Sequence, residues 1–417
     1  MATAREQLAQ FAAGSKALPK LCREYKKERA TVHLKELVGG ALSFYAAAAV
    51  AKTGGVHIFV AEDRDAAAYL LNDFYNLLDE KQVYFFPSSY KRSAAYGAED
   101  AQGVVQRTTA MNAVRGFTKG YLVVCTYPEA LAERVVDAAT LQRDTIAVKL
   151  GDKISIAVLE DALADANFTR VDFVYEPGQY SVRGGIVDVF SYSESKPYRI
   201  DFFGDEVDSI RRFNISSQLS ADKLDRVEIV PNLNAGEAPR VSFVQFAGSG
   251  ATCWFYDADY VLRRVNDLRR KVLADMEEPG QIDRLLTSRN VLLRDMAGNS
   301  VVALRDNLPE RPATVAVVFD TAPQPKFNKN FEMLADDMIR NSLRGYATYI
   351  LSENKVQVER LENIFHQIGR GQAAVRSLSV TLHEGFVDND LKLCLYTDHQ
   401  IFDRYQRYRI NGEIRRD

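Results

Sequence analysis

The sequence predicts an α/β protein of several domains: a first domain built on a parallel sheet, a β-rich α+β domain inserted into it, and a small C-terminal α/β domain. Three observations lead to this prediction. Apolar runs alternate with helical stretches over residues 1–140, which is typical of a doubly wound sheet. Short strands and turn residues replace this alternation over 141–231. After residue 311, helices and strands alternate again.

Composition limits the class of protein further. The chain has 417 residues, of which 47% are hydrophobic and 26% charged, the balance of an ordinary globular protein. The net charge of −3 disfavours a protein that binds DNA along its whole length, because such domains are normally basic. The four cysteines lie more than 100 residues apart, so their spacing predicts neither a zinc site nor a redox motif. We expect no metal.

In the first domain, apolar strands and helices follow one another in regular order. Strands are expected at 31–38, 56–63, 83–88 and 121–126, and helices at 41–52, 64–78 and 103–117. Buried parallel strands are apolar nearly throughout, and their crossover connections are usually helical. A parallel sheet packed between helices is therefore expected.

The turn after the first strand is where a sheet of this kind would bind phosphate. Here the turn carries Gly39 and Gly40, but GK[ST] occurs nowhere in the chain. Phosphoryl transfer would then lack the lysine that neutralises the phosphates and the hydroxyl that holds Mg²⁺. The glycine pair predicts a tight turn in a degenerate, nucleotide-hydrolase-like domain with no bound cofactor. The enzymatic alternative is a hydrolase with a non-standard phosphate loop at this pair.

The hairpin-rich stretch divides the first domain, which we expect to comprise residues 1–140 and 232–310. The insertion, 141–231, begins with a helix at 154–168. In the second segment, we expect a helix at 258–278 and strands at 241–248, 252–256 and 301–306. A third domain, 311–405, should have helices at 331–346 and 354–368 and strands at 347–352, 375–382 and 391–398. The basic end, 406–417, predicts a linker toward modules absent from this sequence.

The densest local signals lie between Glu176 and Phe213. Alternation in PYRIDFF places Arg199 and Phe203 on the strand face opposite the core. Gly184 and Gly185 interrupt the preceding strand, and a β-bulge there would aim Arg183 toward the same face.

An exposed phenylalanine beside two arginines is a mixture enriched in interface hot spots. The pattern equally allows Phe203 to pack under the helix at 154–168, with the arginines paired to Asp201 and Glu206. Both interpretations stay open on the pattern alone.

Two sequence blocks carry a resemblance to known families. EPGQYSVRGGIVDVF followed by PYRIDFFGDEVDSIRRF resembles the matching blocks of UvrB, a damage-recognition protein, and of the transcription–repair coupling factors (Mfd). UvrB proteins carry an intact phosphate-binding motif near their start, and this chain has none. GFVDNDLKLCLYTDHQIF (385–402) resembles the end of the third domain of Mfd. The resemblance therefore favours the N-terminal region of the Mfd family, a UvrB-homology module followed by a small domain.

The resemblance implies a function. In that family the hairpin-rich domain binds UvrA and brings the nucleotide excision repair machinery to stalled RNA polymerase. The family's contact positions match Arg183, Arg199 and Phe203 of this chain. The resemblance also implies further modules of the same protein, a translocase motor and a C-terminal regulatory domain that masks this face. One departure is Ser191, in place of the usual proline after Phe190.

The same resemblance implies a fragment that is not an enzyme and binds DNA weakly or not at all. A UvrB-like binder of damaged DNA is the alternative, and the near-neutral charge disfavours it. The first residues, MATAREQLAQFAAG, have no continuous apolar stretch of the kind that signal peptides need, and no segment is long enough to span a membrane. A cytoplasmic protein is expected.

Overall fold

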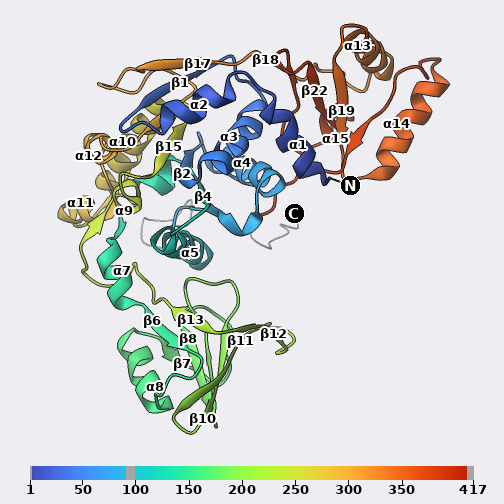
Figure 1. Ribbon diagram of the computed structural model, residues 1–417. Coiled ribbons are helices and arrows are strands. Elements are labelled where there is room, and N and C mark those ends of the chain that lie inside the picture. Colours follow the sequence, from blue (N-terminus) through green and yellow to red (C-terminus); the bar gives the residue numbers. More distant parts are fainter. Residues whose placement is uncertain (1, 91–98, 411–417) are drawn as a thin grey trace.

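Parallel strands form the central sheet of the computed structural model, which describes residues 2–90 and 99–410 (Figure 1). The strand order is β17-β1-β16-β15-β2-β4-β3, and every neighbouring pair is parallel. The strands are Thr31–Lys35 (β1), Gly55–Val60 (β2), Val83–Phe85 (β3), Tyr121–Thr126 (β4), Thr252–Phe255 (β15), Val301–Ala303 (β16) and Val315–Val318 (β17). Most of their residues are buried and apolar. The predicted α/β fold class is confirmed.

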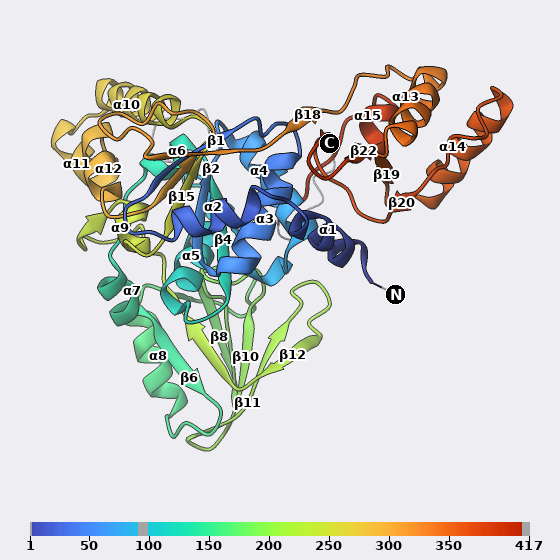
Figure 2. The same ribbon diagram turned by 45° about the horizontal axis from the view of Figure 1, so that its top comes forward.

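Two groups of helices pack on this sheet. The first group consists of α1 (Ala4–Ala13), α2 (Leu18–Tyr25), α3 (Ala41–Thr53) and α4 (Arg64–Leu77). The second consists of α6 (Pro128–Ala132), α9 (Phe243–Ala247), α10 (Ala258–Asp275), α11 (Ile282–Leu285) and α12 (Arg289–Met296), with α5 (Ala101–Gly116) against α9. Figure 2 shows the two groups apart, with strands between them. Asp63 and Asp257 begin α4 and α10 by accepting a backbone N–H of the first turn.

The prediction of a strand at 241–248 is wrong. Only Arg240–Val241 (β14) is extended, pairing with Val135–Val136 (β5), and a helix follows at Phe243–Ala247. Ser242 accepts the backbone N–H of Gln245 and so caps the helix. Phe243 and Phe246, one turn apart, then bury their rings on the same side. An apolar run this short cannot distinguish a strand from a single helical turn.

The second part of the molecule is a β-rich unit that projects from the first sheet (Figure 1). The chain enters through Ala138–Asp144 (α7) and Ile146–Lys149 (β6) and leaves through Arg226–Ile229 (β13), and β6 and β13 pair antiparallel. Between them lies a sheet of order β12-β11-β10-β9-β8-β7. Its strands are Thr169–Arg170 (β7), Gln179–Arg183 (β8), Ile186–Val189 (β9), Tyr198–Phe203 (β10), Glu206–Phe213 (β11) and Ser220–Leu224 (β12). Helix α8 (Ile156–Asp165) packs Leu159 and Leu163 into the core on one face of this sheet.

Gly184 and Gly185 do not form the predicted bulge. They are the turn of a hairpin, because Arg183 on β8 pairs with Ile186 on β9. Gly184 has φ 59°, a conformation that suits glycine in a two-residue turn. The irregularity lies instead on β11, where the register shifts opposite Asp201 and Phe202.

The third part is a smaller α/β unit of sheet order β18-β21-β22-β19-β20. Its strands are Thr321–Pro323 (β18), Ala347–Leu351 (β19), Ser377–Leu378 (β20), Phe386–Asp388 (β21) and Leu393–Thr397 (β22). Its helices are Phe331–Leu343 (α13), Lys355–Gln367 (α14) and Asp398–Ile401 (α15). The domain boundaries stay a prediction, but β17 at 315–318 pairs with β1 and so belongs to the first sheet, although the third domain was expected from residue 311.

The first and third parts share one hydrophobic core, which includes Leu382, Phe386 and Leu395 of the third part. The segment expected to be a linker also packs here. Asn72 on α4 bonds both the backbone N–H and the carbonyl of Arg409, and Ile410 is buried. Residues 406–410 are therefore anchored on α4, whereas 411–417 lie outside the described residues.

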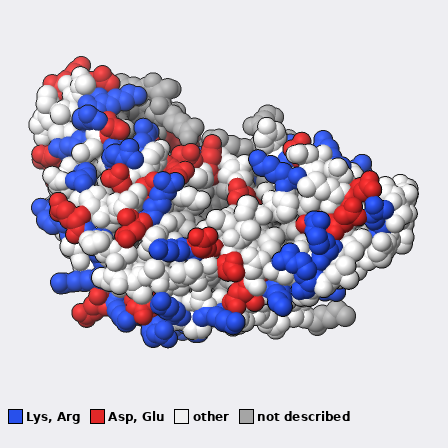
Figure 3. All heavy atoms as spheres, turned by 90° about the horizontal axis from the view of Figure 1, so that it is seen from above, with Lys and Arg blue, Asp and Glu red and all other residues white. Residues whose placement is uncertain are grey.

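Charge is mixed on one face of the molecule. On the face seen in Figure 3, lysine and arginine are interspersed with aspartate and glutamate. Over residues 2–90 and 99–410, no helix combines the length and apolar character that crossing a membrane requires.

Candidate functional site

The candidate site is the face of the six-stranded sheet that points away from α8, called here the outer face. On β10, Tyr198 and Ile200 point into the core, and Arg199 between them points outward. The strand register then places Ser181, Asp188, Arg199 and Arg211 side by side across four strands. A row of polar residues thus crosses the outer face.

Asp188 is the centre of this row. Its side chain is almost fully buried, and it accepts hydrogen bonds from both predicted arginines. Arg199 donates from Nε to Oδ1 at 2.8 Å and from Nη2 to Oδ2 at 3.0 Å. Arg183 donates from Nη2 to Oδ2 at 2.6 Å. The hydrogen bonds between Arg199 and Asp188 raise the pKa of Arg199, and the two cations compensate the cost of burying the carboxylate.

Arg199 is far less exposed than its place on the outer face suggested. Only 13% of its side chain is accessible. Its Nη1 and Nη2 donate to the carbonyl and the side-chain oxygen of Gln218, each at 3.2 Å. Its guanidinium carbon lies 4.2 Å from the ring centroid of the buried Phe213, in a cation–π contact. Arg199 is packed on every side the structure describes.

Arg183 and Phe203 are more accessible. The Arg183 side chain is 36% exposed, and its guanidinium carbon lies 4.7 Å from the ring centroid of Phe173, which is itself 49% exposed. Phe203, at the end of β10, is 83% exposed, whereas Phe202 packs against the core. The alternative in which Phe203 packs under the helix is therefore wrong.

The alternative pairing of the arginines is also wrong. Asp201 is bonded by Arg211 at 2.5 Å and by Ser209 at 2.6 Å, and neither Arg183 nor Arg199 forms an ion pair with Asp201 or Glu206 among the described contacts. The structure thus brings Arg183 and Arg199 together through Asp188. Phe203 stands on the same face, four residues along β10 from Arg199.

Sequence reasoning missed Asp188, Phe173 and Gln218. One signal for Asp188 was available: a charged residue in the apolar run IVDVF of a strand has to find a buried cation. Phe173 and Gln218 lie in loops, over residues 171–178 and 214–219, that fold back onto the outer face. No local pattern predicts such a contact.

The glycine turn at Gly39 and Gly40, where the enzymatic alternative placed a phosphate loop, is covered by another part of the chain. Gly39 has φ 57°, and Gly40 precedes the first turn of α3. A Cβ on Gly40 would overlap the carbonyl oxygen of Glu384, and one on Gly39 would lie 2.9 Å from the carbonyl oxygen of Gly385. The backbone of the third part thus occupies the space over the glycines, and this close approach explains why both lack side chains.

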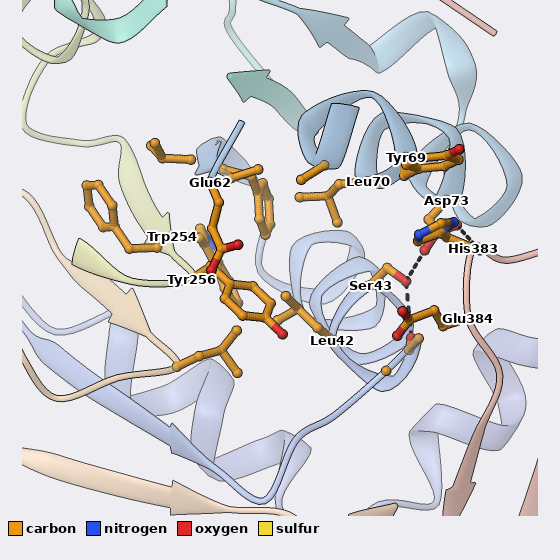
Figure 4. Close-up of a pocket in the computed structure, with 18 of the residues that line it drawn as sticks. Leu42, Ser43, Glu62, Tyr69, Leu70, Asp73, Trp254, Tyr256, His383 and Glu384 are labelled. Carbon is orange, nitrogen blue, oxygen red and sulfur yellow. Dashed lines mark hydrogen bonds between the residues drawn. The ribbon is translucent and has the colours of Figure 1, made fainter. Parts of the chain in front are cut away.

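A cavity of about 270 Å³ remains beside this turn (Figure 4). Glu62, Asp73 and Glu384 are among its lining residues, and none of the described residues that line it is a lysine or arginine. Asp73 accepts hydrogen bonds from Ser43 Oγ and from the backbone N–H of His383, each at 2.7 Å. Burial raises the pKa of Asp73 to about 7. Acidic groups at this position repel phosphate rather than bind it.

No metal site is apparent in the part of the chain that the structure describes. None of its clusters brings together three or more histidine, cysteine, aspartate or glutamate side chains in a metal-binding arrangement. The four cysteines are each buried and unpaired.

Comparisons with known proteins point to the same region. Residues 146–234 match the family model of the UvrB interaction domain. The chain is 27% identical over 199 residues, 48% of its length, to a transcription-repair-coupling factor of Bacillus subtilis and likewise to one of Escherichia coli. It is 35% identical over 101 residues to that of Haemophilus influenzae, which is 24% of this chain and 9% of the relative.

The matches to the Bacillus and Escherichia proteins cover 17% of those relatives. The matched family model coincides with the unit between β6 and β13, which carries Arg183, Arg199 and Phe203. Together these findings confirm the resemblance seen in the sequence: the chain contains a segment that matches the UvrB interaction domain, and about half of its length is similar to transcription-repair-coupling factors.

Proposed function

We propose that this chain is a docking part of a transcription–repair coupling factor and that it recruits UvrA through the outer face of its β-rich unit. The observation that carries the proposal is Phe203, a large apolar side chain, 83% exposed, inside the matched UvrB interaction domain. Arg183 lies on the same face with part of its guanidinium accessible. Aromatic and arginine side chains dominate the binding energy of interfaces.

The proposal includes no catalysis by this chain. The chain has no GK[ST] motif, and the backbone of Glu384 and Gly385 lies over the glycine turn. The described residues that line the cavity beside that turn include acidic side chains but no lysine or arginine that could neutralise a triphosphate. These features weigh against the alternative of a hydrolase with a non-standard phosphate loop. The remaining modules of the full protein, a motor and a regulatory domain, are part of the same proposal.

The net charge of −3 and the mixed charges on the face seen in Figure 3 weigh against the second alternative, a UvrB-like binder of damaged DNA. Such binding would release counterions and fall steeply with salt. We expect the purified chain to show no salt-dependent affinity for damaged duplex DNA in a fluorescence anisotropy titration. A steep salt slope would favour the DNA-binding alternative.

Binding of purified UvrA to the whole chain tests the docking proposal directly. We expect a complex by biolayer interferometry, and we expect Phe203→Ala and Arg183→Ala each to weaken it. Val158→Ala, at an exposed apolar position on α8, is the control and should leave binding unchanged. Reversing the charge of Arg199 is a poor test, because it would leave the buried Asp188 beside a second carboxylate. Normal UvrA binding by the Phe203 variant would refute the assignment of the face.

A further inference from the structure

Arg183 and Arg199 on the outer face differ in how much of their side chains remains free to contact a partner. A guanidinium has five N–H donors. Four hydrogen bonds already leave Arg199: two to Asp188 and two to Gln218. One face of the guanidinium lies over Phe213, and little of the side chain is accessible. Arg199 therefore has almost no surface left for a partner.

Arg199 instead bridges the sheet to a loop. Its bonds to Gln218 tie residues 214–219 to β10, and this loop ends in Leu219, an exposed apolar residue. The other hydrogen bonds described for the loop are made within it: Asn214 Oδ1 accepts the backbone N–H groups of Ser216 and Ser217, and the backbones of Asn214, Gln218 and Leu219 are also bonded to one another. Without the guanidinium, residues 214–219 would keep the hydrogen bonds that they make with one another but would lose the bonds that tie them to β10.

Arg183 likewise bridges the sheet to a loop, on the β8 side of Asp188. Its guanidinium lies between Asp188 and the ring of Phe173, in the loop over 171–178. Asp188 thus holds both arginines, and each arginine holds a loop that presents an exposed apolar side chain. A buried carboxylate with two cations fixes this arrangement more rigidly than a surface ion pair would.

We propose that the surface touched by UvrA consists of Phe203, Phe173, Leu219 and the accessible edge of Arg183, and that Arg199 and Asp188 are positioning residues beneath it. This inference rests on the proposed function. Phe203 stands four residues along β10 from Arg199, about 13 Å at the rise of a strand. A standard interface covers about 800 Å² on each partner, which is wide enough to include both. Phe173 and Leu219 are the contacts that neither the motif nor the alternation indicated.

The positioning role can be tested without UvrA. Hydrogen exchange of the whole chain should rise in residues 214–219 for Arg199→Lys, because an ammonium has three donors on one nitrogen and cannot replace the four bonds that the planar guanidinium makes to Asp188 and Gln218. Asp188→Asn should raise exchange in both 171–178 and 214–219, and Arg183→Ala in 171–178 alone. Unchanged exchange at 214–219 in Arg199→Lys would overturn the positioning role, whatever UvrA does.

The contact surface can be tested by photocrosslinking to UvrA. A benzoyl-phenylalanine is placed in turn at Phe203, Phe173 and Leu219, and at Val158 on α8 as the control facing away from the outer face. Crosslinks from the first three positions and none from Val158 support the inference. A crosslink from Phe203 with none from Phe173 or Leu219 overturns the inference and leaves the proposed function standing. A chain that forms no complex and no crosslink at all overturns both.

Discussion

Asp73 joins the first and third parts of the molecule through a buried carboxyl group. It lies on α4 and accepts hydrogen bonds from Ser43 of α3 and from the backbone of His383 in the third part. Burial raises its pKa from 3.8 to about 7, and the nearby Glu384 adds to the rise. Asn at this position keeps the shape and still accepts the His383 N–H, but it carries no titrating proton. Asp73→Asn should therefore remove a dependence of stability on pH.

The size of this effect follows from the two pKa values. The folded chain holds a proton that the unfolded chain releases above about pH 4, so the stabilisation is complete below 3.8 and is lost as the pH rises through about 7. Each pH unit in this window lowers the free energy of unfolding by about 1.4 kcal/mol. Between pH 5 and pH 8, this group alone should lower the unfolding free energy of the wild type by about 2.5 kcal/mol.

The assay is urea unfolding followed by the fluorescence of Trp254, the only tryptophan of the chain, which lines the same cavity as Asp73. The difference between Asp73→Asn and wild type should change by about 2.5 kcal/mol in favour of the variant from pH 5 to pH 8. Burial lowers the pKa of His57 to about 4, but that group titrates in both chains and cancels in the difference. Asp161→Asn, at an exposed position on α8, controls for the loss of a charge. A difference that stays constant over this pH range would refute the reasoning.

Three further predictions follow from other contacts. Phe203→Ala should leave the melting temperature unchanged, because the side chain is 83% exposed, but should weaken UvrA binding about 30-fold, equivalent to about 2 kcal/mol, by calorimetry. Tyr45→Phe should lower the free energy of unfolding by about 1–3 kcal/mol in urea melts, because the phenol donates to the buried Asp388; an unchanged midpoint would contradict this. Gly40→Ala should open the contact with Glu384, seen as faster proteolysis between the first and third parts, whereas Gly250→Ala, where there is open space for a Cβ and φ is not positive, should not.

Patterns that depend on one element or on neighbouring strands were predictable from the sequence. The alternation of β10 placed Arg199 and Phe203 outside the core, as the structure confirms, because a strand turns successive side chains to opposite faces. The parallel sheet followed from apolar runs separated by helices. The hairpin at Gly184 was misread as a bulge, because adjacent apolar pairs beyond it imitate a change of register.

Contacts between distant segments could not be predicted. The burial of Arg199 depends on Gln218 folding back over it, and the closed glycine turn depends on Glu384, more than 300 residues away. The alternation along a strand predicts the face of the sheet on which a side chain lies, but not whether a distant segment of the chain packs over it. For this reason alternation predicts Arg199 among the exposed contacts, whereas only 13% of its side chain is accessible in the structure.

The paired strands β6 and β13 have a practical consequence. Ile146 and Ile229 are register partners, so the two points where the chain enters and leaves the β-rich unit lie side by side, about 5 Å apart. A unit whose ends meet can be cut out or grafted without stretching either host or insert. The β-rich unit also has its own hydrophobic core of thirteen buried residues, which is separate from the core of the first sheet. The segment matched by the family model, 146–234, is thus also a portable cassette, which could be expressed alone or transplanted into a foreign loop.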